Sequence, residues 1–133
     1  MRIEDCAIIG DTQTIALVGR TGSVDWLCFP RFDSGACFSA ILGGPEHGRW
    51  LLAPRGELRR VTRRYRDATL ILETEMYSDD GTVRVIDFMP LRGRAPDLVR
   101  IVEGVRGRVT MQLELVIRYD YGSSVICLMG VWS

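Results

Sequence analysis

The sequence predicts an all-β protein folded as an antiparallel β-sandwich. Apolar and polar residues alternate with a period of two along much of the chain, which is typical of half-buried strands. Turn-forming residues recur about every ten positions, and no long helical segments intervene. The 133 residues are enough for one domain, assigned to residues 1–133. At most a short helical turn is expected, and whether the sandwich is complete stays open.

The predicted elements follow one another in simple order. A first hairpin joins Thr14–Val18 to Val24–Phe29 through the glycine-containing turn GRTGS. Residues 36–42 are expected to form the short helical turn, which ends at the glycines of GGPEHG. Further extended segments are predicted at Trp50–Ala53, Arg59–Arg66, Ala68–Tyr77, Thr82–Met89, Leu98–Val105 and 109–120.

Two of these strands show which side chains point inward. In the strand at 109–120, one face is expected to carry Val109, Met111, Leu113, Leu115, Ile117 and Tyr119. In the strand at 68–77, the inward residues are expected to be Leu70, Leu72, Thr74 and Met76, with Glu73 and Glu75 outward. The turn SDDG that follows predicts a hairpin, because Asp and Gly tolerate positive φ.

The charge balance limits the classes of partner. The chain has seventeen basic and seventeen acidic residues, so its formal net charge is zero, and nucleic acid and anionic membranes are not expected as partners. No signal peptide and no apolar run of about 18 residues is visible, which predicts a cytoplasmic protein without a membrane span. The four cysteines lack CxxC spacing and are interpreted as reduced.

Two further features were weighed as sites. The arginine run RRVTRRYR could bind nucleic acid, but alternation on a strand divides it between two faces, and a charged edge strand explains it better. His47 is the single histidine and lies in a glycine-rich loop. It therefore supports neither a metal site nor a Ser-His-Asp arrangement.

The segment VDWLCFPRFDSGACF, residues 24–38, carries the strongest chemical signal. It combines four aromatic residues with Asp25, Arg31 and Asp33 around a proline, a composition typical of the wall of a ligand pocket. Two carboxylates about 5 to 9.5 Å apart also form the catalytic pair of glycosidases. The structural alternative stays open: Asp25 would cap the end of a strand, and Asp33 would organise the turn after the proline.

A family resemblance covers most of the chain. The stretch IEDCAIIGDTQTIALVGRTGSVDWLCFPRFDSGACFSAILGG, followed by GRWLLAP, resembles the amino-terminal domain of bacterial glycoside hydrolase family 15 proteins, the glucoamylase-like and trehalase-like enzymes. The stretches RRYRDATLILETEMYSDDGTVRVIDFMPL and LVRIVEGVRGRVTMQLELVIRYDYG extend the resemblance from Ile3 to about Gly122.

This resemblance implies a β-sandwich placed before an (α/α) barrel that carries two catalytic glutamates. In such enzymes the pair hydrolyses α-glucosidic bonds by inversion. No part of the 133 residues corresponds to the barrel, so this chain alone is predicted to be inactive, with no catalytic residue, metal or cofactor. Its expected partners are the catalytic barrel and, in the full-length protein, an α-glucoside substrate.

Four residues are expected to contact that substrate in the intact enzyme: Trp26, Arg31, Phe32 and Asp33. An aromatic ring would stack on the apolar face of a sugar, while Arg31 and Asp33 would hydrogen-bond to its hydroxyl groups. In the architectural alternative, Trp26 and Phe29 fill the core, and Arg31 pairs with Asp33 or Asp25.

The tail SSVICLMGVWS departs from the alternating pattern that the resemblance predicts for the end of the sandwich. An open strand edge there would favour association of copies, so a homo-oligomer is one expectation. Two alternative functions also stay open. A free-standing carbohydrate-binding module would need exposed, coplanar Trp or Tyr rings, and a self-associating structural domain would need no ligand.

Overall fold

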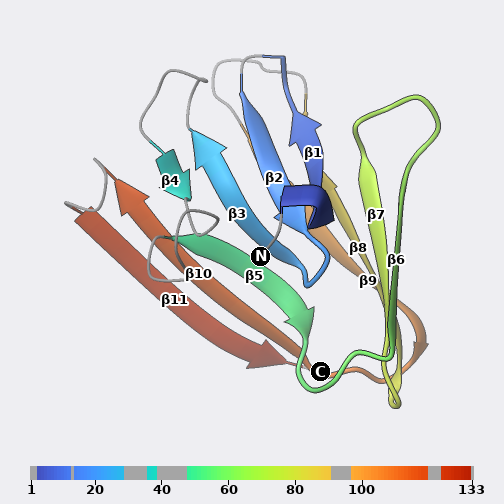
Figure 1. Cartoon of the computed structure of the whole chain (residues 1–133). Coiled ribbons are helices and arrows are strands. Elements are labelled where there is room, and N and C mark those ends of the chain that lie inside the picture. The colour runs from blue at the N-terminus through green and yellow to red at the C-terminus, as the bar shows by residue number, and fades with distance from the viewer. Residues whose placement is uncertain are drawn as a thin grey trace.

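A computed structural model of the chain shows two antiparallel β-sheets (Figure 1). The structure describes residues 3–12, 14–28, 36–38, 48–90, 97–119 and 124–132, with side chains at 4–12, 14–27, 48–90 and 97–116. The larger sheet contains β1 (Cys6–Gly10), β2 (Ile15–Gly19), β3 (Ser23–Cys28), β5 (Arg49–Pro54), β10 (Met111–Tyr119) and β11 (Ser124–Trp132) in that order, with β4 (Ala36–Phe38) paired to β3. The smaller sheet contains β6 (Arg60–Tyr65), β7 (Leu72–Tyr77), β8 (Gly81–Phe88) and β9 (Val99–Gly107). The prediction of an all-β antiparallel sandwich is therefore confirmed.

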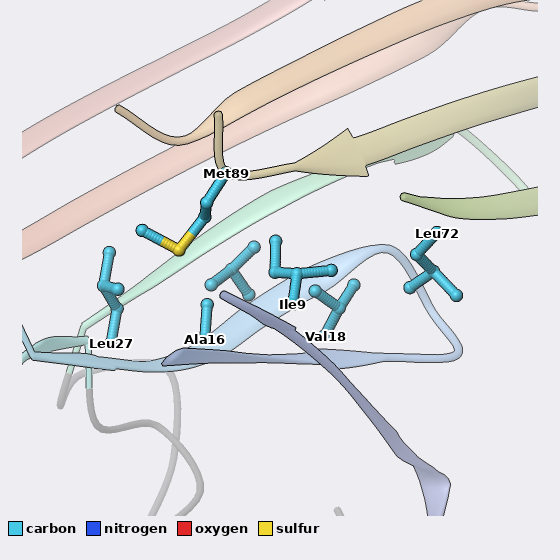
Figure 2. Packing of buried hydrophobic residues seen from close by; sticks show 7 residues of the cluster. Ile9, Ala16, Val18, Leu27, Leu72 and Met89 are labelled. Atoms are coloured by element: carbon cyan, nitrogen blue, oxygen red, sulfur yellow. The ribbon is translucent and has the colours of Figure 1, made fainter. Parts of the chain in front are cut away.

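The core lies between the sheets in two clusters of apolar side chains. In the first, buried residues of the larger sheet meet Leu72 of β7 and Met89, which follows β8 (Figure 2). The cluster consists of Ile9, Ala16, Val18, Val24, Leu27, Leu72 and Met89. The second lies nearer the β5–β10 pair: Leu52, Ala53, Met76, Val83, Val85 and Met111. Burial of these side chains, at about 25 cal/mol per Å² of apolar surface, is the main contribution that holds the two sheets together.

The alternation of β10 is confirmed where its side chains are described. Met111 is buried, and Leu113, Leu115 and Val109 pack against the core clusters. The first hairpin, β2–β3, and the hairpin at the turn SDDG, β7–β8, are both present.

The SDDG turn needs its glycine for a different reason from the one that the sequence suggested. Positive φ does not occur at Asp79, Asp80 or Gly81. Instead, a Cβ atom on Gly81 would lie 2.1 Å from the carbonyl oxygen of Arg106, because β9 approaches the turn closely. The glycine is thus required by close backbone packing.

Two local predictions were wrong. Ala36–Phe38 is a strand paired with β3, not a helical turn, and the rest of that predicted turn lies outside the described residues. The strand predicted from Ala68 begins only at Leu72, and Leu70 is 50% exposed. A turn replaces its first residues: Asp67 has a φ of 51°, and the Thr69 hydroxyl donates to the Arg66 carbonyl.

The two ends of the chain each add a strand that the sequence patterns did not predict. The 3₁₀ turn η1 (Ile3–Asp5) leads into β1, which pairs with β2. The apolar tail forms β11, which pairs with β10 along its whole length, from Met111 opposite Trp132 to Tyr119 opposite Ser124. The larger sheet therefore continues to the end of the described chain.

Two side chains of β6 connect the smaller sheet to the edge of the larger one. The Tyr65 hydroxyl donates to the Ile8 carbonyl at 2.8 Å and accepts from the Ile8 amide at 3.0 Å. Arg63 donates from Nη1 to the Val18 carbonyl at 3.1 Å. Because β1 is an edge strand, the Tyr65 hydroxyl satisfies backbone groups that no neighbouring strand of the described chain pairs.

Candidate functional site

The aromatic segment is held at both of its ends by the pairing of β3 with β4. Leu27 lies opposite Phe38, and Cys28 lies opposite Ala36, so residues 29–35 connect two paired strands. Three of the four predicted substrate-binding residues, Arg31, Phe32 and Asp33, lie outside the described residues, as does Phe29. Their roles stay predictions.

Trp26 is the one predicted site residue whose side chain is described. It lies opposite Leu17 of β2, is partly exposed, and belongs to neither core cluster. The neighbouring Val24 and Leu27, in contrast, are buried in the first cluster. Trp26 thus lies on the strand that precedes residues 29–35, and it does not fill the core.

A β-bulge in β3 produces this arrangement. Val18 of β2 pairs with Val24, and Leu17, the residue before Val18, pairs with Trp26. Asp25 is therefore the extra residue of β3. A bulge locally bends the strand and redirects side chains, and bulges are common beside functional sites. Nothing in the alternation of VDWLC marks the bulge in advance, because it depends on pairing with β2.

Asp25 is a buried carboxylate at this bulge. It is 4% exposed and accepts a hydrogen bond of 2.5 Å from the Ser23 hydroxyl at its Oδ1 atom. Burial raises the pKa of Asp25 above its ordinary value, while the Ser23 hydrogen bond and the charges of Arg49 and Arg100 act in the opposite direction. Asp25 therefore lies inside β3 and does not cap its end.

The adjacent strands carry a partly buried ion pair. Arg49 of β5 donates from Nε and Nη2 to the two carboxylate oxygens of Glu114 in β10, at 3.3 and 3.2 Å. The two side chains are 23% and 27% exposed. The pair fixes the Arg49 guanidinium, whose positive charge offsets part of the rise that burial causes in the pKa of Asp25.

The most deeply buried polar cluster centres on Arg100, at the start of β9. Its side chain is fully buried, and that of Asp87 in β8 is 1% exposed. Arg100 Nε donates to Asp87 Oδ1 at 2.6 Å, Nη1 donates to the Trp50 carbonyl at 2.6 Å, and Nη2 donates to the Gly22 carbonyl at 2.7 Å. The guanidinium also lies 5.3 Å from the centre of the Trp50 ring.

Arg100 thus connects the two sheets through the interior. Asp87 and Arg100 belong to the smaller sheet, whereas Trp50 and Gly22 belong to β5 and to the turn before β3 in the larger sheet. Sequence reasoning missed this cluster. Asp87 follows the buried Val83 and Val85 at a spacing of two residues, which marks it as an inward position of β8, and Arg100 lies directly opposite it.

Gly22 completes the connection because no other residue fits there. Its φ is 90°, and a Cβ atom would lie 2.3 Å from the Leu52 carbonyl oxygen. Its own carbonyl accepts hydrogen bonds from both Arg100 and the Leu52 amide. The turn that begins β3 is therefore fixed against β5, and it supports the strand that leads to residues 29–35.

The arginine run forms contacts within the protein, as a charged edge strand would. β6 is an edge of the smaller sheet, and the burial of its residues alternates. Arg64 and Arg66 contact the buried Glu73, at 3.4 and 3.2 Å, while Arg60 covers the Tyr77 ring at 4.6 Å. The division of these arginines between two faces is confirmed.

Two carboxylates of the smaller sheet, Glu73 and Glu75, have pKa values below their ordinary value because of the hydrogen bonds that they accept. The hydrogen bond from Arg66 is the largest influence that lowers the pKa of Glu73. For Glu75, the hydrogen bond from the Tyr77 hydroxyl is the largest, followed by that from Arg84. A carboxylate that stabilises arginines in this way is a structural partner and is poorly suited to general acid catalysis at neutral pH.

Within the described ranges, no group of three or more His, Cys, Asp or Glu residues could hold a metal ion. His47 lies outside those ranges. In the same part of the chain, no helix has the length and apolar character needed to cross a membrane.

Comparison with known proteins identifies the family. The profile of the family described as "Trehalase-like, N-terminal" matches residues 1–131. Trehalase 2 of Sulfolobus acidocaldarius is 34% identical over 116 residues, which cover 87% of this chain and 19% of that protein. The trehalase of Mycobacterium tuberculosis is 38% identical over 98 residues, covering 74% of this chain and 14% of that protein.

The trehalase of Thermoplasma volcanium is 30% identical over 127 residues, or 91% of this chain and 20% of its own length. This chain therefore spans about a fifth or less of the curated relatives that it matches. No solved structure gives a significant match. The two-sheet architecture, the resemblance of the β3 segment and the match over nearly the whole sequence agree, and the chain belongs to the trehalase-like N-terminal domain family.

Proposed function

We propose that this chain is the non-catalytic amino-terminal β-sandwich of an α-glucoside hydrolase of glycoside hydrolase family 15, of the glucoamylase or trehalase type. It docks on a catalytic barrel in the rest of the parent enzyme. One observation carries the proposal: the trehalase-like N-terminal family matches residues 1–131, while the chain spans about a fifth or less of its trehalase relatives. We further propose a cytoplasmic location, which fractionation of the producing cells would test.

The environment of the described aromatic residues supports docking over the alternative of a free-standing carbohydrate-binding module. Such a module needs flat aromatic rings open to solvent. Arg100 lies over the Trp50 ring, and Arg60 lies over the Tyr77 ring. The hydroxyl of Tyr65 is bound to the backbone of Ile8. These contacts give three aromatic residues structural roles.

We propose that residues 29–35 form part of the wall of the substrate pocket in the intact enzyme. The pairing of β3 with β4 holds both ends of this segment. The bulge and the buried Asp25 fix the strand from which it starts. A rigid base with a loop that carries Arg31 and Asp33 is the usual design of a binding site.

The first experiment measures glucose release from trehalose and from maltose by the isolated chain, with circular dichroism to show that it is folded. No release above a no-protein blank is expected, because no catalytic pair is proposed within this chain. Turnover by the folded chain would contradict the proposal. Calorimetric titration with the same sugars tests the binding-module alternative, for which saturable binding would be the supporting result.

The second experiment compares Arg31→Ala with Arg55→Ala in the intact enzyme. Arg55 is exposed and follows β5, so it serves as a control for the loss of one arginine. Arg31→Ala is expected to raise KM or lower kcat at an unchanged melting temperature, while Arg55→Ala changes neither. A lower melting temperature with unchanged kinetics would instead assign Arg31 an architectural role.

A further inference from the structure

β9 has a free edge in the described molecule. It is the last strand of the smaller sheet and, among the described residues, pairs only with β8. Five large apolar side chains of the described chain are exposed, and two of them, Ile101 and Val105, lie on this strand with 45% and 46% exposure. An edge strand with β-branched, exposed apolar residues is a template for pairing with another strand.

Two other edges of the described sandwich, β1 and β6, are protected by side chains. The Ile8 backbone in β1 already bonds to the Tyr65 hydroxyl. β6 presents Arg60 and Arg64, and charged residues on an edge disfavour strand addition. Along β9, no comparable contact covers the outer edge among the described residues.

A surface hollow of about 330 Å³ lies beside β9 and is lined by Val83, Val102, Gly104, Val109 and Met111, among others. A Cβ atom built on Gly104 would meet no atom within 4 Å. The surface beside Gly104 is therefore open to solvent.

We propose that β9 pairs in antiparallel fashion with β9 of a second copy of this chain, so that two four-stranded sheets join into one. A two-fold axis at Ile101 would place the two Ile101 side chains opposite each other. The same axis places Val99 opposite Glu103 of the partner copy. This pairing extends over Val99–Glu103 and ends before the bulge that follows Gly104.

The charges of the molecule permit this contact. The two Glu103 side chains are not placed opposite each other, and each can keep its 3.1 Å ion pair with Arg84 of its own copy. Arg100 stays engaged with Asp87 in the interior. The formal net charge of zero removes the long-range repulsion that keeps copies of a charged protein apart. The proposal does not depend on the proposed enzymatic role.

Sedimentation velocity of the chain over a range of concentrations tests the proposal. We expect a reversible change from one to two chains within about 5 to 500 μM, because a short strand pairing buries little surface. The test variant is Ile101→Lys/Val105→Lys. The matched control is Ile8→Lys/Leu70→Lys, which adds the same charge at residues that are 45% and 50% exposed.

The dissociation constant of the dimer is expected to rise at least tenfold in the test variant. In the control variant it should stay within twofold of the wild-type value, apart from the effect of the added charge that both variants share. Since two lysines can disturb folding, Ile101→Thr/Val105→Thr is measured as well. It keeps the β-propensity and should weaken the dimer by a smaller factor. A wild-type chain that stays monomeric at the highest concentration would overturn the proposal, as would equal weakening in the test and control variants.

Discussion

β6 and β9 are the two edge strands of one four-stranded sheet, but their contacts with the rest of the protein differ. β6 reaches across to the larger sheet with Tyr65 and Arg63, whose donors and acceptors meet backbone groups of Ile8 and Val18. β9 is anchored near its start by Arg100 but then presents Ile101 and Val105 to solvent. The same sheet thus has one edge bound to the rest of the sandwich and one edge available for pairing.

The difference shows where polar side chains align the two sheets and where they do not. Side chains of β6 and the side chain of Arg100 donate to backbone carbonyls of the larger sheet. These hydrogen bonds fix how the two sheets are aligned. Apolar packing alone is non-directional and would tolerate a shift between them. Beyond Arg100, no such contact is made along β9 within the described chain, and the backbone groups at its outer edge are free for another strand.

Arg100→Met should have the largest effect on stability. The change removes the hydrogen bonds to Trp50 and Gly22 and leaves the Asp87 carboxylate buried without its cation. Removing one partner of a buried pair costs about 3 to 5 kcal/mol of the free energy of unfolding. Urea denaturation would measure the loss.

The double variant Arg100→Met/Asp87→Leu is the control for this prediction. It should recover part of the stability, since the second change removes the unpaired buried charge. A loss of less than about 1 kcal/mol in Arg100→Met would show that Arg100 does not hold the sheets together.

Gly22→Ala should come next, compared with Gly56→Ala. Both glycines have positive φ, at 90° and 112°, so both variants pay the backbone strain of about 1 to 2 kcal/mol. A Cβ atom on Gly22 would additionally collide with the Leu52 carbonyl oxygen, whereas Gly56 has open space around it. Thermal denaturation should show a clearly lower melting temperature for Gly22→Ala. Equal melting temperatures would contradict the close approach at this turn.

Tyr65→Phe should cost about 1 kcal/mol of stability, because two exposed hydrogen bonds to Ile8 are lost while the ring remains. The same change opens the β1 edge. We therefore expect Tyr65→Phe to associate more strongly than wild type in sedimentation experiments, so that β1 behaves more like β9. Unchanged association would mean that the tyrosine does not protect this edge.

Asp25→Asn should have the smallest effect, visible mainly in its dependence on pH. The raised pKa of Asp25 means that its charge destabilises the folded state above that pKa. As the pH falls through the folded pKa, wild type should gain stability relative to Asp25→Asn, and the difference should level off below the ordinary value of 3.8. Parallel urea curves at several pH values would measure it. A difference that is independent of pH would contradict the raised pKa.

Much of the architecture could be predicted because strand alternation is local. Met111, Leu113 and Leu115 reveal their face through their spacing alone, and the SDDG turn marks its hairpin. The start of β7 could not be predicted in this way. Leu70 continues the apolar phase, but Asp67 and Thr69 form a turn whose hydrogen bonds override it.

The candidate site was less accessible to sequence reasoning for a physical reason. The composition of the aromatic segment and the strand at its start can be read from the sequence. The bulge at Asp25 cannot, because it arises only from pairing with Leu17 and Val18. Asp87 breaks the inward apolar series Val83, Val85 and Met89, which indicates a buried polar partner, whereas Arg100 alternates with the apolar Val99 and Ile101 and gives no such signal. The backbone partners of Arg100 in Trp50 and Gly22 depend on how the two sheets meet, and no local pattern encodes that.

Amide hydrogen exchange, followed at low and high protein concentration, tests the contrast between the two edges most directly. The Ile8 amide, bonded to the Tyr65 hydroxyl, should be protected equally at both concentrations. Alternate amides between Val99 and Glu103, those that point away from β8, should exchange rapidly in dilute protein and become protected in concentrated protein. Rapid exchange at Ile8, or β9 protection that does not change with concentration, would contradict a closed β6 side and an open β9 edge.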